Sequence, residues 1–313
     1  MKFRSKFINS ISYRLQSMAL SALTMSAANA KISKKKSMAG LLSKIAFDLL
    51  GIRKKYMVQA IRTSLRVNES EAEDIARKSV FTFVFNCLEM SKLCYFSEKW
   101  LENVVRPKDM INLQNALARK CGVIIVSGHF GLWELIPPWL SLRGHIVNTV
   151  VRRQNNPLAD KWMDKMRTRF GAETTDSGYS IRKILRTLKQ NKILALMVDQ
   201  DNGDKGIFVP FFDRPASAPT GPAVISLKTG APIVPLFLIP DYCGKHKLVV
   251  HSPIYPEDYS NDSYGQWLIT KKYTQILQSY VKKYPHQWFW LHRRWKTTLD
   301  KAPDNPWAAF CVS

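Results

Sequence analysis

The clearest structural signal in this 313-residue chain is the segment Val123-Ile-Ile-Val-Ser-Gly-His129-Phe-Gly-Leu-Trp-Glu134. An apolar, β-branched run that ends in Ser-Gly is typical of a buried strand that enters a turn. His129 follows this strand directly, and Glu134 comes five residues later, where helical periodicity begins. The histidine therefore lies at the carboxyl end of a strand, which is the edge where open α/β sheets bind their ligands.

The alternation of apolar strands and amphipathic helices continues beyond this segment. Apolar runs predict strands at 122–127, 146–151, 193–198, 233–238 and 248–251. Helical periodicity predicts helices near 132–142, 157–170, 179–190, 221–229 and 265–284. This order predicts an α/β fold with a mixed, mostly parallel sheet covered by helices. No Gly/Ser-rich linker interrupts it, so we expect residues 61–313 to form one domain.

A long helix is predicted over residues 70–96, ahead of the first strand. Ser70 matches the first position of a capping box, in which its side chain caps the helix and Glu73 reaches back. Hydrophobic residues then recur at helical spacing through Phe85 and Leu88.

Residues 1–60 form a basic segment of a different character. They hold 12 Lys and Arg against one acid, Asp48, and so contribute +11 of the chain's net charge of +23. Such an excess favours a polyanionic partner, which could be nucleic acid, an anionic membrane surface or a phosphorylated substrate. Residues 1–30 resemble an export signal only superficially, because the apolar part is short and lysines follow it at once.

No apolar run in this segment reaches the roughly 18–20 residues of a membrane-spanning helix. Residues 38–51 carry apolar side chains on a helical period beside lysines. This pattern suits the interface of an anionic leaflet, and it equally suits a helix packed on the main domain. We therefore expect a helical segment at the N-terminus, which would be membrane-associating if the rest of the chain points to a lipid substrate.

The pair of His129 and Glu134 predicts acid–base chemistry. A carboxylate that holds one nitrogen of a histidine orients the ring, so that the other nitrogen can accept a proton from a hydroxyl. Glu134 follows about one helical turn into the helix, and we expect its carboxylate to fold back toward the His129 ring. An isolated pair of this spacing is more often a capping histidine with an unrelated acid.

Other chemistries are not indicated. No serine or cysteine lies in a GxSxG-type elbow, so a covalent acyl-enzyme is not expected. The histidines lack ligand spacing, and the five cysteines are scattered, which predicts neither a metal site nor a disulfide framework.

Further polar residues follow the predicted strands or belong to an aromatic and basic C-terminal motif. The candidates for substrate binding are Arg152, Arg153, Asn156, Arg167, Arg169, Asp199, Thr220, Gly221, Arg293 and Arg294. Guanidinium groups match phosphate geometry, an acid at a strand end could hold those arginines or a sugar, and a helix N-terminus favours anions. Each motif alone also has an ordinary structural explanation, such as a solvated rim, a turn or core packing.

In their order along the chain, the motifs resemble those of one enzyme family. The motifs are HFGLWE at 129–134, VRRQNNP at 151–157, DQD at 199–201, VPFF at 209–212, APTG at 218–221, TGAPIVP at 229–235 and QWFWLHRRWK at 287–296. They closely resemble the bacterial lipid A biosynthesis acyltransferases, the late lauroyl and myristoyl transferases of the lysophospholipid acyltransferase superfamily. The resemblance covers about residues 70–300.

The resemblance implies a glycerolipid acyltransferase-like fold with His129 as general base and Glu134 as its orienting partner. Arg152 and Asp199 match the basic and acidic positions after the second and third strands. The other matching positions are Asn156, Arg167, Arg169, Arg293 and Arg294. Arg153 departs from the pattern, because the family often has proline there, and the N-terminal anchor is shorter and more polar than usual.

The implied reaction moves a fatty acyl chain from acyl carrier protein to the hydroxyl of a 3-hydroxyacyl chain. The acceptor would be a phosphorylated, Kdo-bearing lipid A precursor, at the cytoplasmic face of the bacterial inner membrane. No metal or redox cofactor is expected, because a thioester is already activated.

Two alternatives remain open at this point. The first is an acyltransferase that acts on another glycolipid, such as a phosphatidylinositol mannoside, or that uses acyl-CoA. The second is a basic nucleic-acid-binding protein, which accounts for the charge of +23 but not for a histidine and a glutamate at a strand end. No nucleic-acid-binding module is visible, so we expect no nucleic-acid partner.

Overall fold

The computed structural model describes residues 2–176, 181–241, 244–302 and 304–311. A seven-stranded sheet in the order β1-β9-β8-β2-β5-β3-β4 lies at its centre. Its strands are β1 (Val105–Lys108), β2 (Val123–Ser127), β3 (Val147–Val151), β4 (Glu173–Asp176), β5 (Ile193–Met197), β8 (Ile233–Pro240) and β9 (His246–Val250). Neighbouring strands are parallel except for the antiparallel pair β8 and β9, which confirms the predicted mixed, mostly parallel sheet.

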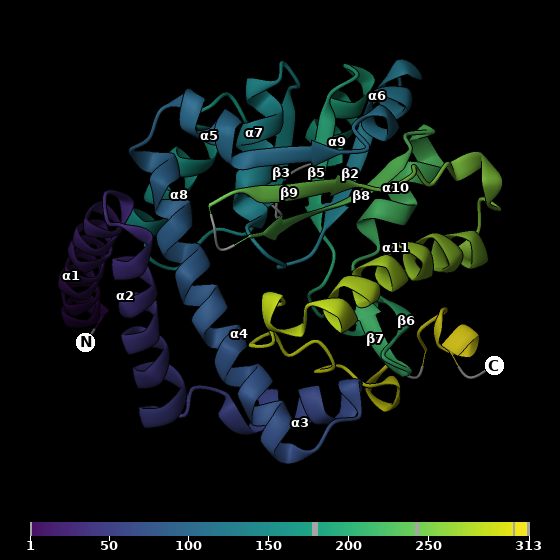
Figure 1. Cartoon of the computed structure of the whole chain (residues 1–313). Coiled ribbons are helices and arrows are strands. Elements are labelled where there is room, and N and C mark those ends of the chain that lie inside the picture. The colour runs from purple at the N-terminus through teal and green to yellow at the C-terminus, as the bar shows by residue number, and fades with distance from the viewer. Residues whose placement is uncertain (1, 177–180, 242–243, 303, 312–313) are drawn as a thin grey trace.

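Helices cover both faces of the sheet (Figure 1). One face packs against α5 (Glu98–Val104), α6 (Ile111–Ala118), α7 (Ile136–Leu142) and α8 (Pro157–Thr168). The other packs against α9 (Ile181–Lys189), α10 (Gly221–Thr229) and α11 (Ser263–Lys283), with the hairpin β6 (Ile207–Phe211) and β7 (Arg214–Ala218). Strand β2 contributes side chains to both cores, because alternate side chains of a strand point to opposite faces. Val123 and Ile125 pack in one core, and Ile124 and Val126 pack in the other.

Short helical turns connect these elements. They are the π-helical turn η1 (Ile45–Leu49) and the 3₁₀ turns η2 (Ser91–Cys94), η3 (Trp133–Leu135), η4 (Gly203–Lys205), η5 (Pro256–Asp258), η6 (Pro285–Gln287), η7 (Leu299–Lys301) and η8 (Ala308–Cys311). The five strands expected from the sequence are all present, within a few residues of the expected ends. Strands β1, β4, β6 and β7 were not expected, since they are short or lack a continuous apolar run. The start of the helix expected at 179–190 lies partly outside the described residues.

The long helix α4 (Glu69–Met90) begins one residue earlier than expected, and its predicted cap is wrong. The capping box is formed by Asn68, whose side chain accepts a hydrogen bond from the backbone N–H of Glu71 at 2.9 Å. The backbone N–H of Asn68 donates in return to the Glu71 carboxylate. Both positions fit the pattern of a cap followed three residues later by Glu, but Glu73 is instead paired with Lys54 at 2.8 Å.

Three N-terminal helices lie beside α4: α1 (Lys2–Ala28), α2 (Ile32–Lys44) and α3 (Lys54–Leu65) (Figure 1). Lys35 of α2 is completely buried against Glu89 of α4, with 2.7 Å between Nζ and Oε1. In the part of the chain that the structure describes, no helix combines the length and the hydropathy needed to cross a bilayer.

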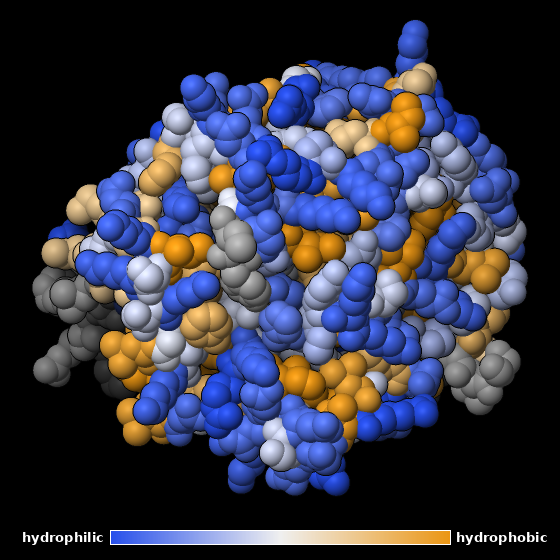
Figure 2. Space-filling model, in the orientation of Figure 1, coloured by the Kyte–Doolittle hydropathy of each residue, from blue (hydrophilic) through white to orange (hydrophobic). Residues whose placement is uncertain are grey.

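The N-terminal segment nevertheless exposes an unusual share of apolar surface. Eight of the fourteen large apolar side chains that the described residues expose belong to it: Met18, Met25, Ile32, Leu41, Ile45, Leu49, Leu50 and Ile52. Figure 2 shows apolar residues among polar ones over the region of α2. The structure therefore shows helices here, as expected, with an apolar surface that the described residues leave exposed.

Candidate active site

The register of strands β2 and β5 brings two distant residues together. The strands are parallel neighbours in which Ser127 is aligned with Met197. His129 lies two residues beyond Ser127, and Asp199 lies two residues beyond Met197. Because both segments continue for two residues beyond this aligned pair, the imidazole lies beside the carboxylate at the carboxyl edge of the sheet. Gly128 leaves room for this approach, because a Cβ there would lie 3.2 Å from Asp199 Oδ2.

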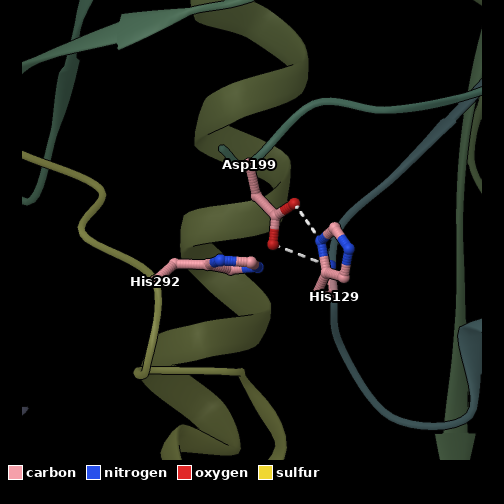
Figure 3. Close-up of side chains that lie close together, drawn as sticks. All are labelled: His129, Asp199 and His292. Carbon is pink, nitrogen blue, oxygen red and sulfur yellow. Dashed lines mark hydrogen bonds and ion pairs between the residues drawn. The ribbon is translucent and has the colours of Figure 1, made fainter. Parts of the chain in front are cut away.

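Asp199 holds His129 at two points (Figure 3). Its Oδ1 lies 2.7 Å from the ring Nδ1, and its Oδ2 accepts a hydrogen bond from the His129 backbone N–H at 2.7 Å. Trp288 Nε1–H donates to the same Oδ2 at 2.9 Å. The second ring nitrogen of His129 points away from Asp199 in Figure 3, so one nitrogen is held and the other is available.

Electrostatics keeps Asp199 ionised although the residue is fully buried. Burial alone would raise the pKa of Asp199, but the neighbouring His129, His292 and the Trp288 donor hold that pKa well below its usual range. An ionised carboxylate only accepts hydrogen bonds. His129 Nδ1 therefore carries the proton that binds Asp199, and in the neutral ring the lone pair lies on Nε2.

The expected contact between Glu134 and His129 is absent from the structure, and Asp199 occupies that position instead. Glu134 lies in the 3₁₀ turn η3, where its carboxylate receives two hydrogen bonds from Arg167 of α8, at 2.9 Å and 2.5 Å. The two side chains are only 11% and 14% exposed. The physical reason is competition: a guanidinium fork matches a carboxylate at two points, whereas an imidazole offers one donor.

The residues that follow β3 serve other contacts. Arg153 lies among the acids Asp160, Asp164 and Asp176, at 3.2 to 3.7 Å. Asn156 caps α8 through Leu158 N–H and Ala159 N–H, and its amide donates to the backbone of Tyr13 in α1. These contacts brace α8 and α1, and the expectation that the two residues bind substrate stays a prediction.

The remaining candidates are more scattered. Arg169, two residues beyond Arg167 in the sequence, donates to the Leu93 carbonyl at 3.1 Å. Arg152 is exposed beyond β3. Thr220 and Gly221 open α10, but the Thr220 side chain forms no capping hydrogen bond. The structure does not bring these four residues to His129.

The C-terminal motif 287–296 reaches His129 through the backbone, since Phe289 N–H donates to the His129 carbonyl at 3.0 Å. Within it, Arg294 is only 1% exposed, and its guanidinium donates to the carbonyls of Gln200 and Ser217. In this structure Arg294 therefore holds the backbone, and its expected contact with substrate stays a prediction. Arg293, by contrast, lines an open pocket beside His292.

Sequence analysis did not single out His292 and Trp288, which complete the surroundings of Asp199. The His292 ring lies edge-on to His129, with 4.6 Å between ring centroids. Burial lowers the pKa of His292 to about 4. The aromatic and basic character of the motif was visible, but no local pattern showed which of its residues would face Asp199.

His129, Asp199 and His292 also have the composition of a metal site, with one donor atom from each within 4.8 Å of the others. The 2.7 Å contact between His129 Nδ1 and Asp199 has the length of a hydrogen bond. A cation bound to both atoms would have to replace the proton between them. The cluster could therefore hold a metal only after the proton between His129 Nδ1 and Asp199 has been lost.

The geometry is suited to removing a proton from a neutral group. A histidine with one nitrogen held by an ionised carboxylate and the other free is the general-base half of many acyl-transfer sites. The thiol of Cys87, beside Glu134, is no competing nucleophile, because burial raises its pKa to about 12.

Comparison with known proteins identifies the family of this chain. The profile of the family described as bacterial lipid A biosynthesis acyltransferase matches residues 66–297. The chain is 22% identical to the lipid A biosynthesis lauroyltransferase of Escherichia coli, over 84% of this chain and 86% of that one. It is 25% identical to the phosphatidylinositol mannoside acyltransferase of Mycobacterium tuberculosis, but the match spans 61% of this chain and only 60% of that relative.

Among solved structures, the chain is similar to the 1-acyl-sn-glycerophosphate acyltransferase PlsC from Thermotoga maritima. The likeness has a TM-score of 0.41 and 12% identity, and covers 82% of this chain and 99% of that one.

Proposed function

This chain belongs to the bacterial lipid A biosynthesis acyltransferase family, and from that membership we propose that it transfers a fatty acyl chain to a hydroxyl of a lipid A precursor or a related glycolipid. The observation that carries the proposal is the bond between His129 Nδ1 and Asp199. It leaves Nε2 free to act as a base at the edge of the sheet where ligands bind.

The proposed step needs no group beyond these residues and the two substrates. His129 Nε2 takes the proton of the acceptor hydroxyl as its oxygen attacks the thioester carbonyl. The carbon–oxygen bond forms, the carbon–sulfur bond breaks, and the imidazolium returns the proton to the departing thiolate. Asp199 stabilises the imidazolium while it exists. Glu134 and Arg167 act as a second pair, which positions the helix that follows His129.

For the substrates, we propose acyl carrier protein as donor and a Kdo-bearing lipid A precursor as acceptor. The net charge of +23 suits an acidic carrier protein and a phosphorylated acceptor. A second candidate is a phosphatidylinositol mannoside acceptor, and the similarity to the mycobacterial relative favours it. Both candidates use the same base and differ in the lipid that is recognised.

We further propose that the protein binds the cytoplasmic face of the bacterial inner membrane through its N-terminal helices. The exposed side chains of Leu49 and Leu50 lie in a segment with a net charge of +11. Apolar side chains beside lysines bind anionic interfaces by burial and by charge together.

The catalytic proposal is tested by acyl transfer in vitro. The wild type is assayed with acyl carrier protein thioesters of several chain lengths and with acyl-CoA, on a tetra-acylated, Kdo-bearing lipid A precursor and on a phosphatidylinositol mannoside. Loss of a proton-transfer group costs about 10²–10⁴-fold in rate, so His129→Ala is expected to lose that much. His145→Gln is the matched control, because no hydrogen bond or ion pair of its side chain is seen among the described residues. An active His129→Ala variant would refute the assignment of the base.

The membrane proposal is tested by co-sedimentation with vesicles. The wild type is expected to bind vesicles that contain anionic lipid and to bind neutral vesicles weakly. The double variant Leu49→Glu/Leu50→Glu should lose binding, because these side chains are 78% and 64% exposed and would enter the interface. Ile111→Glu, a change at a similarly exposed residue on α6, should not alter binding. Equal binding by all three proteins would contradict the proposal.

A further inference from the structure

A polar pocket of about 380 Å³ adjoins the proposed catalytic pair. Its lining residues come from three parts of the chain: Arg53, Gln200, Asp201, His292, Arg293 and Lys296. His292 connects the pocket to the catalytic site, since its ring contacts His129 at a centroid distance of 4.6 Å. Gln200 and Asp201 directly follow Asp199. A ligand in this pocket would therefore lie next to the reacting groups.

The charge of the pocket is positive. Arg53, Arg293 and Lys296 bring three cations, and none of them forms an ion pair with an acid in the described part of the chain. The single acid, Asp201, is already engaged. Its carboxylate accepts hydrogen bonds from the backbone N–H and the hydroxyl of Thr297, at 3.0 and 2.8 Å.

The two arginines of the C-terminal motif have opposite environments. Arg294 is buried and donates to the carbonyls of Gln200 and Ser217, so it holds the wall of the pocket. Arg293 is exposed on the pocket side. The buried Arg294 thus fixes the backbone of this segment, and with it the positions of the exposed Arg293 and Lys296.

Arg53 is brought to the pocket by an unusual backbone. It has φ of 54°, in the left-handed region that residues other than glycine seldom adopt. Its guanidinium donates one hydrogen bond to the Leu291 carbonyl, which leaves most of its five N–H donors available. Uncommon backbone conformations of this kind occur often at functional sites. Arg53 lies outside the family match of residues 66–297.

We infer that this pocket binds a phosphate group of one of the two substrates and so fixes that substrate beside His129. Two guanidinium groups and an ammonium group provide charge-assisted donors, which are the recurrent means of binding phosphate. The inference rests on the proposed acyl transfer. It extends that proposal by naming the group that is recognised and by giving the N-terminal segment a part in recognition.

Either substrate could supply the phosphate. A phosphorylated glycolipid acceptor carries it on the headgroup, and a carrier protein or coenzyme A donor carries it on the pantetheine arm. Kinetics distinguish these sources, because loss of a contact to one substrate raises the KM for that substrate alone when the other is saturating.

The first experiment measures phosphate binding without turnover. Inorganic phosphate is titrated into the full chain by calorimetry at constant ionic strength. One charge-assisted hydrogen bond contributes about 1.5–3 kcal/mol, which corresponds to about 10-fold or more in Kd. Arg293→Gln and Arg53→Gln should each weaken binding by this factor, and Lys296→Gln by a similar or smaller one. Lys55→Gln removes one exposed charge in α3, two residues along the chain from Arg53, and should bind as the wild type does.

Circular dichroism verifies that each variant is folded. Because the side chains of Arg293 and Lys296 are exposed, their substitution should not unfold the protein, so a loss of phosphate binding in both variants reports on the pocket. Wild-type binding that no variant weakens, or no binding by the wild type at millimolar phosphate, overturns the inference.

The second experiment identifies the source of the phosphate. An increase in the KM for the acceptor in Arg293→Gln, which disappears with a dephosphorylated acceptor, assigns the pocket to the acceptor. An increase in the KM for the donor, which disappears with an acyl-pantetheine that lacks the phosphate, assigns it to the donor. Unchanged KM values in an active enzyme refute the pocket and leave the acyltransferase proposal intact. An inert wild type that still binds phosphate through Arg53 and Arg293 refutes the acyltransferase proposal alone.

Discussion

Two carboxylates near His129 have different partners. Glu134 is five residues away along the chain, yet it is bound at two points by Arg167 of α8. Asp199 is 70 residues away, yet it holds both the ring and the backbone of His129. Nearness in sequence therefore did not decide which acid reaches the histidine, whereas the alignment of β2 and β5 did.

The difference has a chemical consequence. Asp199 is fully buried and directly bound to the proposed base, so it acts on the proton transfer itself. Glu134 acts through Arg167 and through the turn that both residues stabilise. The first carboxylate should govern the rate of the reaction, and the second should govern the stability of the surrounding fold.

The largest effect is expected from Asp199→Asn. The amide keeps the size of the side chain but removes the negative charge that orients and stabilises the imidazolium. A rate loss of about 10²–10⁴-fold is expected, measured as kcat with both substrates saturating. Glu134→Gln is the matched comparison, and it should lose less. A kcat that falls sharply in Glu134→Gln but stays nearly normal in Asp199→Asn would show that Glu134 reaches His129 during catalysis.

The second effect concerns the stability of the Glu134–Arg167 pair. Removing one partner of a mostly buried pair leaves the other charge uncompensated and costs about 3–5 kcal/mol. Glu134→Gln should therefore lower the free energy of unfolding in urea by about that amount, and the double variant Glu134→Gln/Arg167→Met should recover part of it. Asp74→Asn, which breaks the exposed pair with Lys78, should cost no more than about 1 kcal/mol. Equal losses at both pairs would mean that Glu134 is exposed to solvent.

A smaller effect is expected on the pH dependence of stability. The pKa of Asp199 is lower in the folded protein than in the unfolded chain, so its ionised form favours folding. This contribution is complete above the unfolded pKa of about 4 and is lost as the pH falls toward the folded pKa. Between pH 5 and pH 2, roughly the span over which such a carboxyl titrates, Asp199→Asn should lose less stability than the wild type, as measured by thermal unfolding. Parallel curves for the two proteins would contradict the low pKa.

The smallest effect is expected from removing metal ions. If the His129–Asp199 contact is a hydrogen bond, prolonged treatment with a chelator should leave kcat unchanged. The control is a wild-type sample carried through the same treatment without chelator. Activity that disappears with chelation and returns on addition of one divalent metal would show instead that His129, Asp199 and His292 bind that metal.

The sequence predicted correctly those parts of the fold that depend on short-range hydrophobic periodicity. The strand β2, the neighbouring strands and helices, and the position of His129 at a strand end all follow from hydrophobic periodicity. The motif order was sufficient to identify the family, which the match to residues 66–297 confirms. The cap of α4 was misplaced because two overlapping segments, Asn68–Glu71 and Ser70–Glu73, fit the same short pattern.

The arrangement of the site was predicted less well. The sequence placed Arg293 and Arg294 side by side, but only the packed chain shows that Arg294 is buried while Arg293 faces a pocket. In the same way, Arg53 carried no signal of its own, because its place beside Leu291 depends on how the chain folds between two residues 238 positions apart.

Residue types and their spacing were enough to set the α/β architecture, the proposed base and the basic character of the chain. Tertiary structure alone selected Asp199 as the partner of His129, gave Glu134 to Arg167 and assembled the cationic pocket. The physical reason is that hydrophobic periodicity and capping act within a few residues, whereas a hydrogen bond between distant residues depends on strand register and on which competing partner binds more strongly.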